Sequence, residues 1–373
     1  MATPEHYRFA CLARLDAESW CRLIDRVTSP LDLIGRPAEQ LMALGLSKAA
    51  AVALEHTDLA KHRATLEALA RHHIELIAAH EPDYPSQLRV LRGAPALLFI
   101  RGNRSALETP QLAIVGSRHP TANGALTARD LAFHFAQCGL TITSGLAIGI
   151  DAASHTGALA AEGVTLAVCG TGLDRTYPHT HAELAHRILE TGALISEFPP
   201  GTPPLPHHFV QRNRIISGLS VGVLVIEAAA RSGSLTTARY AADQGREVFG
   251  VPGSIHSPLS RGCHGLLREG ATLVENAKDV FRSLQFNQQN QIVKISDRPP
   301  QSPPWEGSPL DNPAEILLDA LGFEPTGLDA LIASTGLSST SVASLLIALE
   351  TEGRVASDSE GRLYRMLHPI QTR

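Results

Sequence analysis

Short, continuously apolar runs follow one another through the middle of the chain. They are ALLFI (96–100), LAIVGS (112–117), LTITSG (140–145), TLAVCG (165–170), ALISEF (193–198), VGVLVIEA (221–228), EVFGVPG (247–253) and ATLVE (271–275). Strands that are buried on both faces have such sequences. Between the runs, apolar residues recur at helical spacing, over 123–138, 150–162, 181–190, 234–244 and 262–269. This alternation predicts βαβ units and an α/β fold with a doubly wound, mostly parallel sheet.

The two ends of the chain have different patterns. Before residue 80, apolar residues spaced three and four apart predict a small helical domain, including a long Ala/Leu/His stretch at 48–80. A segment rich in Gln, Asn and then Pro predicts an extended, semi-rigid linker. After it, three short helical patterns precede a hairpin around Glu360 and Gly361, a succession typical of a winged helix. The predicted domains are a helical domain at 1–80, a sheet domain at 81–285, a linker at 286–310 and a winged helix at 311–373.

The composition excludes several classes of protein. Of the 373 residues, 44% are apolar and 18% are charged, so the chain is not wholly disordered or collagen-like. No apolar run reaches the roughly 18 residues of a membrane helix, and the first residues lack the regions of a signal peptide. Five scattered cysteines without a C-x-x-C pair favour neither a disulfide framework nor a zinc site. We therefore expect a cytoplasmic protein with no membrane contact and no metal.

The net charge of −5 would argue against a nucleic-acid partner, but the charge is unevenly distributed. Residues 111–285 hold 13 basic and 13 acidic residues, whereas 311–373 hold 4 basic and 9 acidic ones. The acidic excess therefore lies in the predicted winged helix. Only four of the 32 basic residues are lysines, so a site for anions would be built from arginine and backbone N–H groups.

Small residues and arginines collect where the predicted strands end. They are Gly116, Ser117 and Arg118 at the end of the run at 112–117, Ser144 and Gly145 at the end of the next run, and Arg231, Ser232, Gly233 and Ser234 after the run at 221–228. Small residues let backbone N–H groups approach a phosphate closely, and the carboxyl ends of parallel strands share one edge of the sheet. Any one such turn can be plain geometry, but together with the arginines they predict an anion-binding groove.

The segment HHFVQRNRIISGLS, residues 207–220, places Phe209 close to Arg212, Asn213 and Arg214. Guanidinium groups suit phosphates and an aromatic face suits a nucleobase, which is the combination that single-strand binders use. The alternative interpretation is a salt-bridged helix start with Phe209 in the core.

Spacing disfavours other kinds of site. The first turn, G-S-R-H-P, lacks the G-x-G-x-x-G of a dinucleotide site, and no lysine stands in a P-loop. Asp151 and Glu227 could act as acid or base, although carboxylates at such turns more often cap helices or pair with arginine. His155, His179 and His181 have no metal-like spacing, and no G-x-S-x-G elbow follows a strand. We therefore expect no cofactor and no catalysis.

Seven motifs occur in a fixed order along the chain. They are AIVGSR (113–118), SGLAIGID (144–151), EFPPGTPP (197–204), FVQRNRIISGLS (209–220), VIEAAARSGSLTTA (225–238), VPG (251–253) and GCHGLLREGA (262–271). Together they resemble the DNA-processing protein A (DprA, also called Smf) family of bacteria. The helical front end resembles that family's SAM-like or helix-hairpin-helix extension, and 311–367 resembles its winged-helix tail.

The resemblance implies a non-catalytic protein with an extended Rossmann-like domain that binds single-stranded DNA (ssDNA). It also implies dimerisation through that domain, protection of incoming ssDNA, and loading of RecA onto it during natural transformation. The ssDNA-binding residues implied are Ser117, Arg118, Ser144, Gly145, Phe209, Arg212, Asn213, Arg214, Ser232, Gly233, Ser234 and His264. In this scheme Arg118 holds a phosphate, Phe209 stacks on a base, and Arg212 and Arg214 grip phosphate or fix the groove wall. Residues 232–234 present N–H and hydroxyl donors.

The chain departs from the family pattern in two places. His207 and His208 stand where the family often has a lysine, and a neutral histidine holds phosphate less well, so we expect a pH-sensitive affinity. His264 stands where many members have asparagine. Both departures affect the polar contacts expected in the groove.

Two other functions on the same fold stay open: a nucleotide-cleaving, phosphoribohydrolase-like enzyme and a mononucleotide sensor. The enzyme group uses a P-G-G-x-G-T-x-x-E motif, where this chain has EAAARSGSLTTA. The segment SSTSVASLLIALETEG of the winged helix contains no Lys or Arg, unlike the helix that usually binds duplex DNA. We expect this domain to act in protein contacts or autoregulation.

Overall fold

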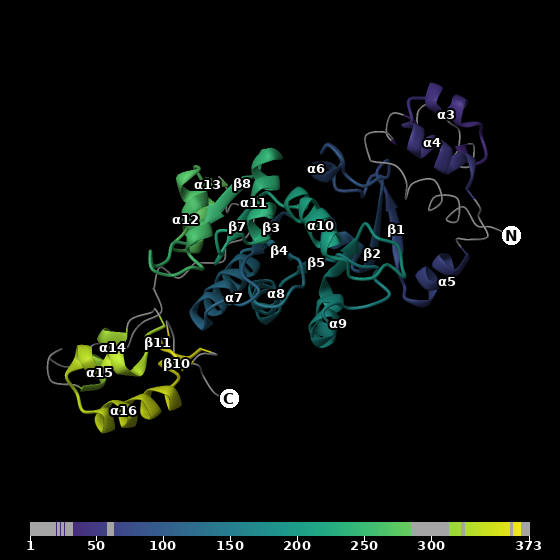
Figure 1. Cartoon of the computed structure of the whole chain (residues 1–373). Coiled ribbons are helices and arrows are strands. Elements are labelled where there is room, and N and C mark those ends of the chain that lie inside the picture. The colour runs from purple at the N-terminus through teal and green to yellow at the C-terminus, as the bar shows by residue number, and fades with distance from the viewer. Residues whose placement is uncertain are drawn as a thin grey trace.

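Our computed structural model describes residues 20, 23, 26, 33–57, 63–284, 313–321, 325–358 and 361–366 (Figure 1). In the N-terminal region, α3 (Ala38–Ala43) packs against α4 (Lys48–Glu55), and α5 (Arg63–Arg71) precedes the sheet. Most of the helical pattern before residue 33 and the whole predicted linker lie outside the described residues.

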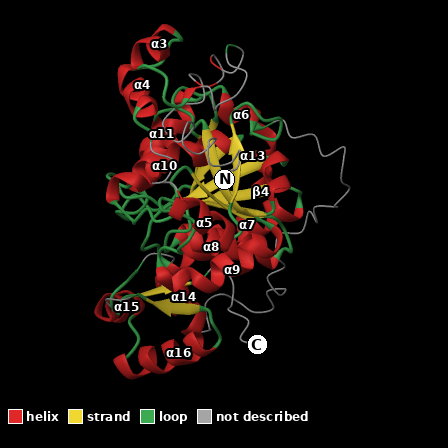
Figure 2. Cartoon of the chain, turned by 90° about the vertical axis from the view of Figure 1, so that its right-hand side faces the viewer, coloured by secondary structure: helices red, strands yellow, loops and turns green. Residues whose placement is uncertain are grey.

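A nine-stranded sheet forms the centre of the molecule (Figure 2). Its strands are β1 (Glu75–Ala78), β2 (Leu97–Gly102), β3 (Gln111–Val115), β4 (Thr141–Ser144), β5 (Thr165–Val168), β6 (Ala193–Ser196), β7 (Gly222–Val225), β8 (Glu247–Gly250) and β9 (Thr272–Leu273). They lie in the order β1-β2-β6-β5-β4-β3-β7-β8-β9, and every pair from β6 to β9 in this order is parallel. The predicted α/β fold with a mostly parallel sheet is confirmed.

An antiparallel pair extends one edge of the sheet. β2 pairs antiparallel with β6, and β1 pairs antiparallel with β2, with Leu76 opposite Phe99. β1 lies within the stretch 48–80 that the sequence predicts to be helical, so that prediction is wrong for its last residues. A four-residue strand is too short for hydrophobic periodicity to distinguish it from the end of a helix. The sheet therefore begins at Glu75, ahead of the predicted boundary at 81.

Helices cover both faces of the sheet, as a doubly wound fold requires. One layer contains α9 (Ala182–Thr191), α10 (Pro206–Leu219), α11 (Ser234–Asp243) and α12 (Arg261–Arg268), and the other contains α7 (Ala122–Gln137), α8 (Ile150–Ala160) and α13 (Ala277–Ser283). Along β3, Ala113 and Val115 belong to the core of the first layer, whereas Leu112 and Ile114 belong to that of the second. Because both faces are buried, the strands have continuously apolar sequences.

The winding of the chain reverses between β3 and β7. From β3 the chain passes through α7 to β4 on one side, and it reaches β7 on the other side only after β6. Loops that leave neighbouring strands in opposite directions open a crevice at the carboxyl ends, where ligands of open α/β sheets bind. The turns after β3 and β7 are therefore the strongest candidates for a binding site.

The C-terminal residues form a small domain with its own core. Its elements are α14 (Pro313–Leu321), α15 (Leu328–Thr335), α16 (Ser339–Thr351), β10 (Val355–Ser357) and β11 (Leu363–Arg365), the two strands being antiparallel. Leu317, Leu331 and Leu346 are among its core residues. Three helices and a hairpin confirm the predicted winged helix, although Glu360 in the predicted turn lies outside the described residues.

Within the part of the chain that the structure describes, no single helix could span a membrane; only α15 and α16 together have the required length and composition, and they are bent by 113°.

Candidate nucleic-acid interface

A groove of about 450 Å³ opens at the switch point, along the carboxyl ends of β3 and β7. Its walls come from the turns after β3 and β4, the first half of α10, and the turn between β7 and α11. Eight of the twelve residues predicted to bind ssDNA line it. They are Ser117, Arg118, Phe209, Arg212, Asn213, Ser232, Gly233 and Ser234.

Hydrogen bonds hold the turn after β3 against β7 and α8. Ser117 donates its N–H to the carbonyl of Glu227 at 2.7 Å and accepts from the N–H of Ile150 at 3.1 Å. A side chain at Gly116 would come within 2.6 Å of Ile150, so glycine permits this close approach. The Glu227 carboxylate accepts from the N–H and the hydroxyl of Thr121, at 2.9 and 2.7 Å. Glu227 therefore fixes the segment between β3 and α7.

Arg118 is exposed at the rim of the groove, beside an aromatic ring. Its Cζ lies 5.9 Å from the centroid of the Phe209 ring, within the range of a cation–π contact. Phe209 is half-buried on α10 and packs over Gly170, where an added Cβ would lie 2.8 Å from the ring. The ring of Tyr177, 45% exposed, lies 5.4 Å from that of Phe209 between centroids. One side of the groove thus combines a cationic group with two aromatic rings.

Arg212 forms the floor of the groove and is only 4% exposed. Its Nη1 donates to the carbonyl of Gly145 at 2.7 Å and to that of Val168, and these two residues lie at the carboxyl ends of β4 and β5. The carboxylate of Asp151 accepts from the N–H of Gly145 at 3.1 Å and from that of Ala147 at 3.3 Å. Of the two roles predicted for Arg212, this geometry favours fixing the groove wall over gripping phosphate.

Burial opposes both charges beneath the groove. It raises the pKa of Asp151, although the positive charge of Arg212 acts in the opposite direction. It lowers the pKa of Arg212, against the charge of Asp151. The two opposite charges therefore stabilise one another, which ties the turn after β4 to α10.

The turn between β7 and α11 forms the opposite wall. The hydroxyls of Ser232 and Ser234 share a hydrogen bond of 2.7 Å, and the N–H of Ser234 donates to the Ser232 Oγ at 3.3 Å. Asn213 reaches this turn from α10, with its Nδ2 donating to the carbonyl of Gly233 at 3.4 Å. Arg231 is exposed and also lines the groove. Each of the two turns at the switch point thus carries an exposed guanidinium group.

Arg214 lies outside the groove lining, unlike the prediction for it. It pairs with Glu197, whose carboxylate also accepts from the Nε2 of Gln211 at 3.0 Å. Residues two apart on a helix point about 200° apart, so Arg212 and Arg214 cannot face the same groove. Arg214 corresponds to the salt-bridged alternative and braces α10 against the segment after β6.

Three further predicted residues do not line the groove. Ser144 is fully buried and donates its hydroxyl to the carbonyl of Ile114 at 2.6 Å. Gly145 is next to the groove, but its N–H and carbonyl are bonded within the protein. His264 lies on α12, where its Nε2 is 3.0 Å from the carbonyl oxygen of Gly253. Ser144 and Gly145 shape the floor, whereas His264 lies on α12, outside the groove lining.

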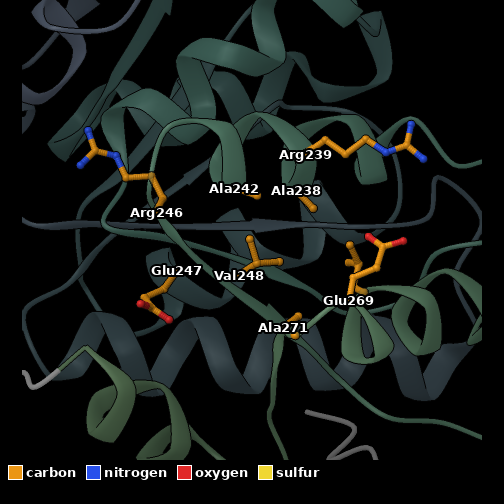
Figure 3. Close-up of a pocket in the computed structure, with 10 residues that line it drawn as sticks. Ala238, Arg239, Ala242, Arg246, Glu247, Val248, Glu269 and Ala271 are labelled. Carbon is orange, nitrogen blue, oxygen red and sulfur yellow. The ribbon is translucent and has the colours of Figure 1, made fainter.

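A smaller cavity of about 270 Å³ lies between α11, α12 and β8 (Figure 3). Arg239, Arg246, Glu247 and Glu269 line it, and Figure 3 shows the two guanidinium groups pointing away from each other. Two positive and two negative side chains do not make a cradle for phosphate. The groove is therefore the stronger candidate.

The structure offers little for metal or thiol chemistry. Among the described residues, no group of three or more His, Cys, Asp or Glu side chains could hold a metal ion. Burial raises the pKa of Cys169 to about 11 and that of Cys263 to about 12. These two thiols therefore stay protonated and pack as apolar side chains.

Comparison with known proteins identifies the family of the chain. The sequence model of the family described as DNA recombination-mediator protein A matches residues 75–285, and that of the DprA winged helix domain matches 299–361. The chain belongs to the DNA recombination-mediator protein A (DprA) family. The predicted resemblance is confirmed, and the first match begins where β1 begins.

Relatives and solved structures of the DprA family cover most of the chain. Protein Smf of Escherichia coli (strain K12) is 44% identical over 307 residues, 81% of this chain and 80% of the relative. DNA processing protein DprA of Streptococcus pneumoniae is 46% identical over 203 residues, 54% of this chain and 72% of the relative. The X-ray structure of the S. pneumoniae protein has a TM-score of 0.64 at 35% identity and covers 76% of this chain and 96% of that one. DprA from Helicobacter pylori, whose structure concerns its single-stranded DNA binding mode, has a TM-score of 0.51 at 28% identity. The match covers 56% of this chain and 98% of the H. pylori chain. The Rossmann-like α/β fold of the family is thus confirmed for this chain.

Sequence reasoning missed one residue that lines this DprA groove and one aromatic ring beside it. Arg231 was noticed at a strand end but was not among the predicted DNA-binding residues, although it directly precedes Ser232. Tyr177 lies after β5, far along the chain from Phe209, and no sequence signal connects the two rings. Only the folded structure brings this aromatic pair together.

His155 is a core histidine of α8 in this DprA domain. Its Nδ1 lies 2.7 Å from the hydroxyl of Thr165, which itself donates to the carbonyl of Ile142, so Nδ1 carries the proton. The Nε2 atom is buried without a hydrogen-bond partner. Burial lowers the pKa of His155 to about 3.

We expect this histidine to make the protein less stable as the pH falls from about 6.5 to about 3. In that window the unfolded chain binds a proton at residue 155 and the folded protein does not. At pH 5 the loss amounts to about 2 kcal/mol of unfolding free energy. Urea unfolding between pH 5 and 7 should show a shallower pH dependence for His155→Asn than for the unmodified protein. Parallel pH profiles for the two proteins would contradict this assignment.

Proposed function

We propose that this protein is an ssDNA-binding recombination mediator and that the groove at the switch point holds the strand. The observation that supports this best is the placing of exposed Arg118 and Arg231 on the two strand-end turns, with Phe209 of α10 beside Arg118 in the same groove. Guanidinium groups bind backbone phosphates, and an aromatic face stacks on any base, so the combination suits single strands without a fixed sequence. Ser232, Gly233 and Asn213 add polar groups to the groove wall at the turn between β7 and α11.

The finer functions rest on family membership. The family is named for recombination mediation, and the related H. pylori protein is described by its single-stranded DNA binding mode. We propose accordingly that the protein protects incoming ssDNA in the cytoplasm and loads RecA onto it during natural transformation. It acts as a homodimer formed through the Rossmann-like domain.

The protein carries out no catalysis in this proposal. The two carboxylates that could have served as acid or base both have structural partners. Asp151 is buried and accepts from backbone N–H groups of the turn after β4, and Glu227 accepts from Thr121. These contacts give the nucleotide-cleaving alternative no support.

Arg118→Ala should weaken binding of labelled oligo-dT about tenfold and make the dependence on salt shallower. Loss of one phosphate contact to a single strand lowers the magnitude of the log–log salt slope by about 0.7. Fluorescence anisotropy over a salt series measures both effects, with duplex DNA of equal length as the competing ligand. The unmodified protein should prefer the single strand clearly.

Arg187→Ala is the matched control, because Arg187 is also exposed but lies on α9, outside the groove lining. It should leave affinity and salt slope unchanged. Equal affinity of the unmodified protein for single and double strands would overturn the proposed function. So would calorimetric binding of a mononucleotide as tight as that of oligo-dT, which would favour a sensor.

A further inference from the structure

A second, larger cleft lies between the winged helix and the Rossmann-like domain. It measures about 730 Å³. The Rossmann-like side contributes the segment from Arg118 to Thr121, Ala125 on α7, and the loop at 256–259, and the winged helix contributes Arg362 and Tyr364. Figure 1 shows the winged helix turning its strands β10 and β11, and not α16, toward α7. The hairpin of the winged helix thus closes a space that neither domain forms alone.

A direct contact holds the hairpin in this place. Asn123, in the first turn of α7, is 9% exposed and donates from its Nδ2 to the carbonyl of Arg365 at 2.6 Å. Tyr364, the neighbouring residue on β11, is 3% exposed. The hairpin therefore packs against the Rossmann-like domain beside the turn that carries Arg118.

The cleft continues the groove. Arg118 lines both, so its guanidinium group stands at the boundary between the two spaces. A strand whose phosphate is held by Arg118 has the groove on one side and the cleft on the other. A flexible polymer can occupy both, whereas a mononucleotide can occupy only one.

The charge of the winged helix supports this direction for the strand. Residues 311–353 hold seven acidic residues and no basic one, whereas 354–366 hold three basic and two acidic residues. The domain is acidic on its helices and slightly basic along its hairpin, which is the side that faces the cleft. Arg362 pairs with Asp358 at 2.8 Å. Arg118, His119 and His256 line the cleft from the Rossmann-like side, and the lining therefore favours an anionic ligand.

We propose that this interdomain cleft is a second subsite for the same single strand, completed by the hairpin of the winged helix. The inference rests on the proposed function and extends the strand's path from the groove past Arg118. It also differs from the expectation that the acidic winged helix acts in protein contacts or autoregulation. The alternative, in which the hairpin blocks the strand and the domain is autoinhibitory, predicts the opposite response to the variants below.

The test compares oligo-dT of about 5 nucleotides, enough for the groove, with oligo-dT of about 15 nucleotides. Two full-length variants alter the cleft: Arg362→Ala removes a charge from the hairpin, and Ala125→Trp fills the space from α7. Arg354→Ala is the matched control, since Arg354 lies on the same domain but does not line the cleft. Fluorescence anisotropy at several salt concentrations gives the affinity and the salt slope of each protein for each of the two oligonucleotides.

We expect both cleft variants to bind the longer strand about fivefold more weakly and the shorter strand unchanged. Arg362→Ala should also lower the magnitude of the salt slope for the longer strand by about 0.7. Equal effects on both lengths, or none on either, would overturn the inference and leave the proposed function standing. Tighter binding by the variants would overturn it in favour of an autoinhibitory hairpin. Failure of the unmodified protein to bind either strand would overturn the proposed function as well.

Discussion

Replacement of Arg212 by methionine should lower the free energy of unfolding by about 3–5 kcal/mol. Its guanidinium group bonds the carbonyls of Gly145 and Val168 and balances the buried carboxylate of Asp151. Methionine fills a similar volume but leaves these acceptors without a donor and the carboxylate without a counter-charge. Urea unfolding followed by circular dichroism measures the change, and oligo-dT binding should be lost with it.

The destabilisation should come mainly from the unpaired carboxylate. Adding Asp151→Asn to Arg212→Met should therefore restore part of the lost stability, because no buried charge is left. Arg187→Met, an exposed arginine replaced in the same way, should change stability by less than about 0.5 kcal/mol. If Arg212→Met kept full stability and lost only binding, Arg212 would be a phosphate ligand and the structural role would be wrong.

Reversing the charge of both exposed groove arginines should abolish most ssDNA binding without unfolding the protein. Arg118→Glu with Arg231→Glu removes two charge-assisted contacts of about 1.5 kcal/mol each, which corresponds to a loss of at least about 100-fold in affinity. Both side chains are exposed, so the thermal midpoint should barely move. Anisotropy with oligo-dT and a thermal melt of the same sample provide the two readouts.

The control for this experiment has the same net charge. Arg187 and Arg282 are exposed and lie outside the groove, so Arg187→Glu with Arg282→Glu shifts the global charge equally. If this control lost as much affinity as the groove variant, binding would depend on the overall charge and not on the groove.

Much of the fold could be predicted because both faces of its central strands are buried. Each strand from β4 to β8 lies within a predicted apolar run, β3 begins one residue before its run, and α7, α8, α9, α11 and α12 lie within a residue or two of their predicted bounds. β1 could not be predicted, since it continues an Ala- and Leu-rich stretch whose apolar residues have helical spacing. Its strand conformation is determined by pairing with β2, a contact that local sequence does not encode.

The sequence predicted the position of the groove in the fold better than it predicted which side chains face the groove. Ser117, Arg118 and Ser232 line one groove, as their places at strand ends predict, because topology alone brings these turns together. Which side chain faces the ligand depends on helix rotation and on competing partners. Arg214 lies away from the groove because Glu197 pairs with it, and nothing near Arg214 in the sequence identifies that acid.

The buried bonds of Arg212 have a consequence for how a strand is accommodated. They link the ends of β4 and β5 to α10 through bonds within the protein, so the floor of the groove is held together without any contact to DNA. Little of the binding free energy is then needed to order the protein, and the entropic penalty falls on the polymer. Strands whose bases are already unstacked and separately accessible suit such a preorganised surface, whereas a strand that is stiffened by its own base stacking must first be loosened.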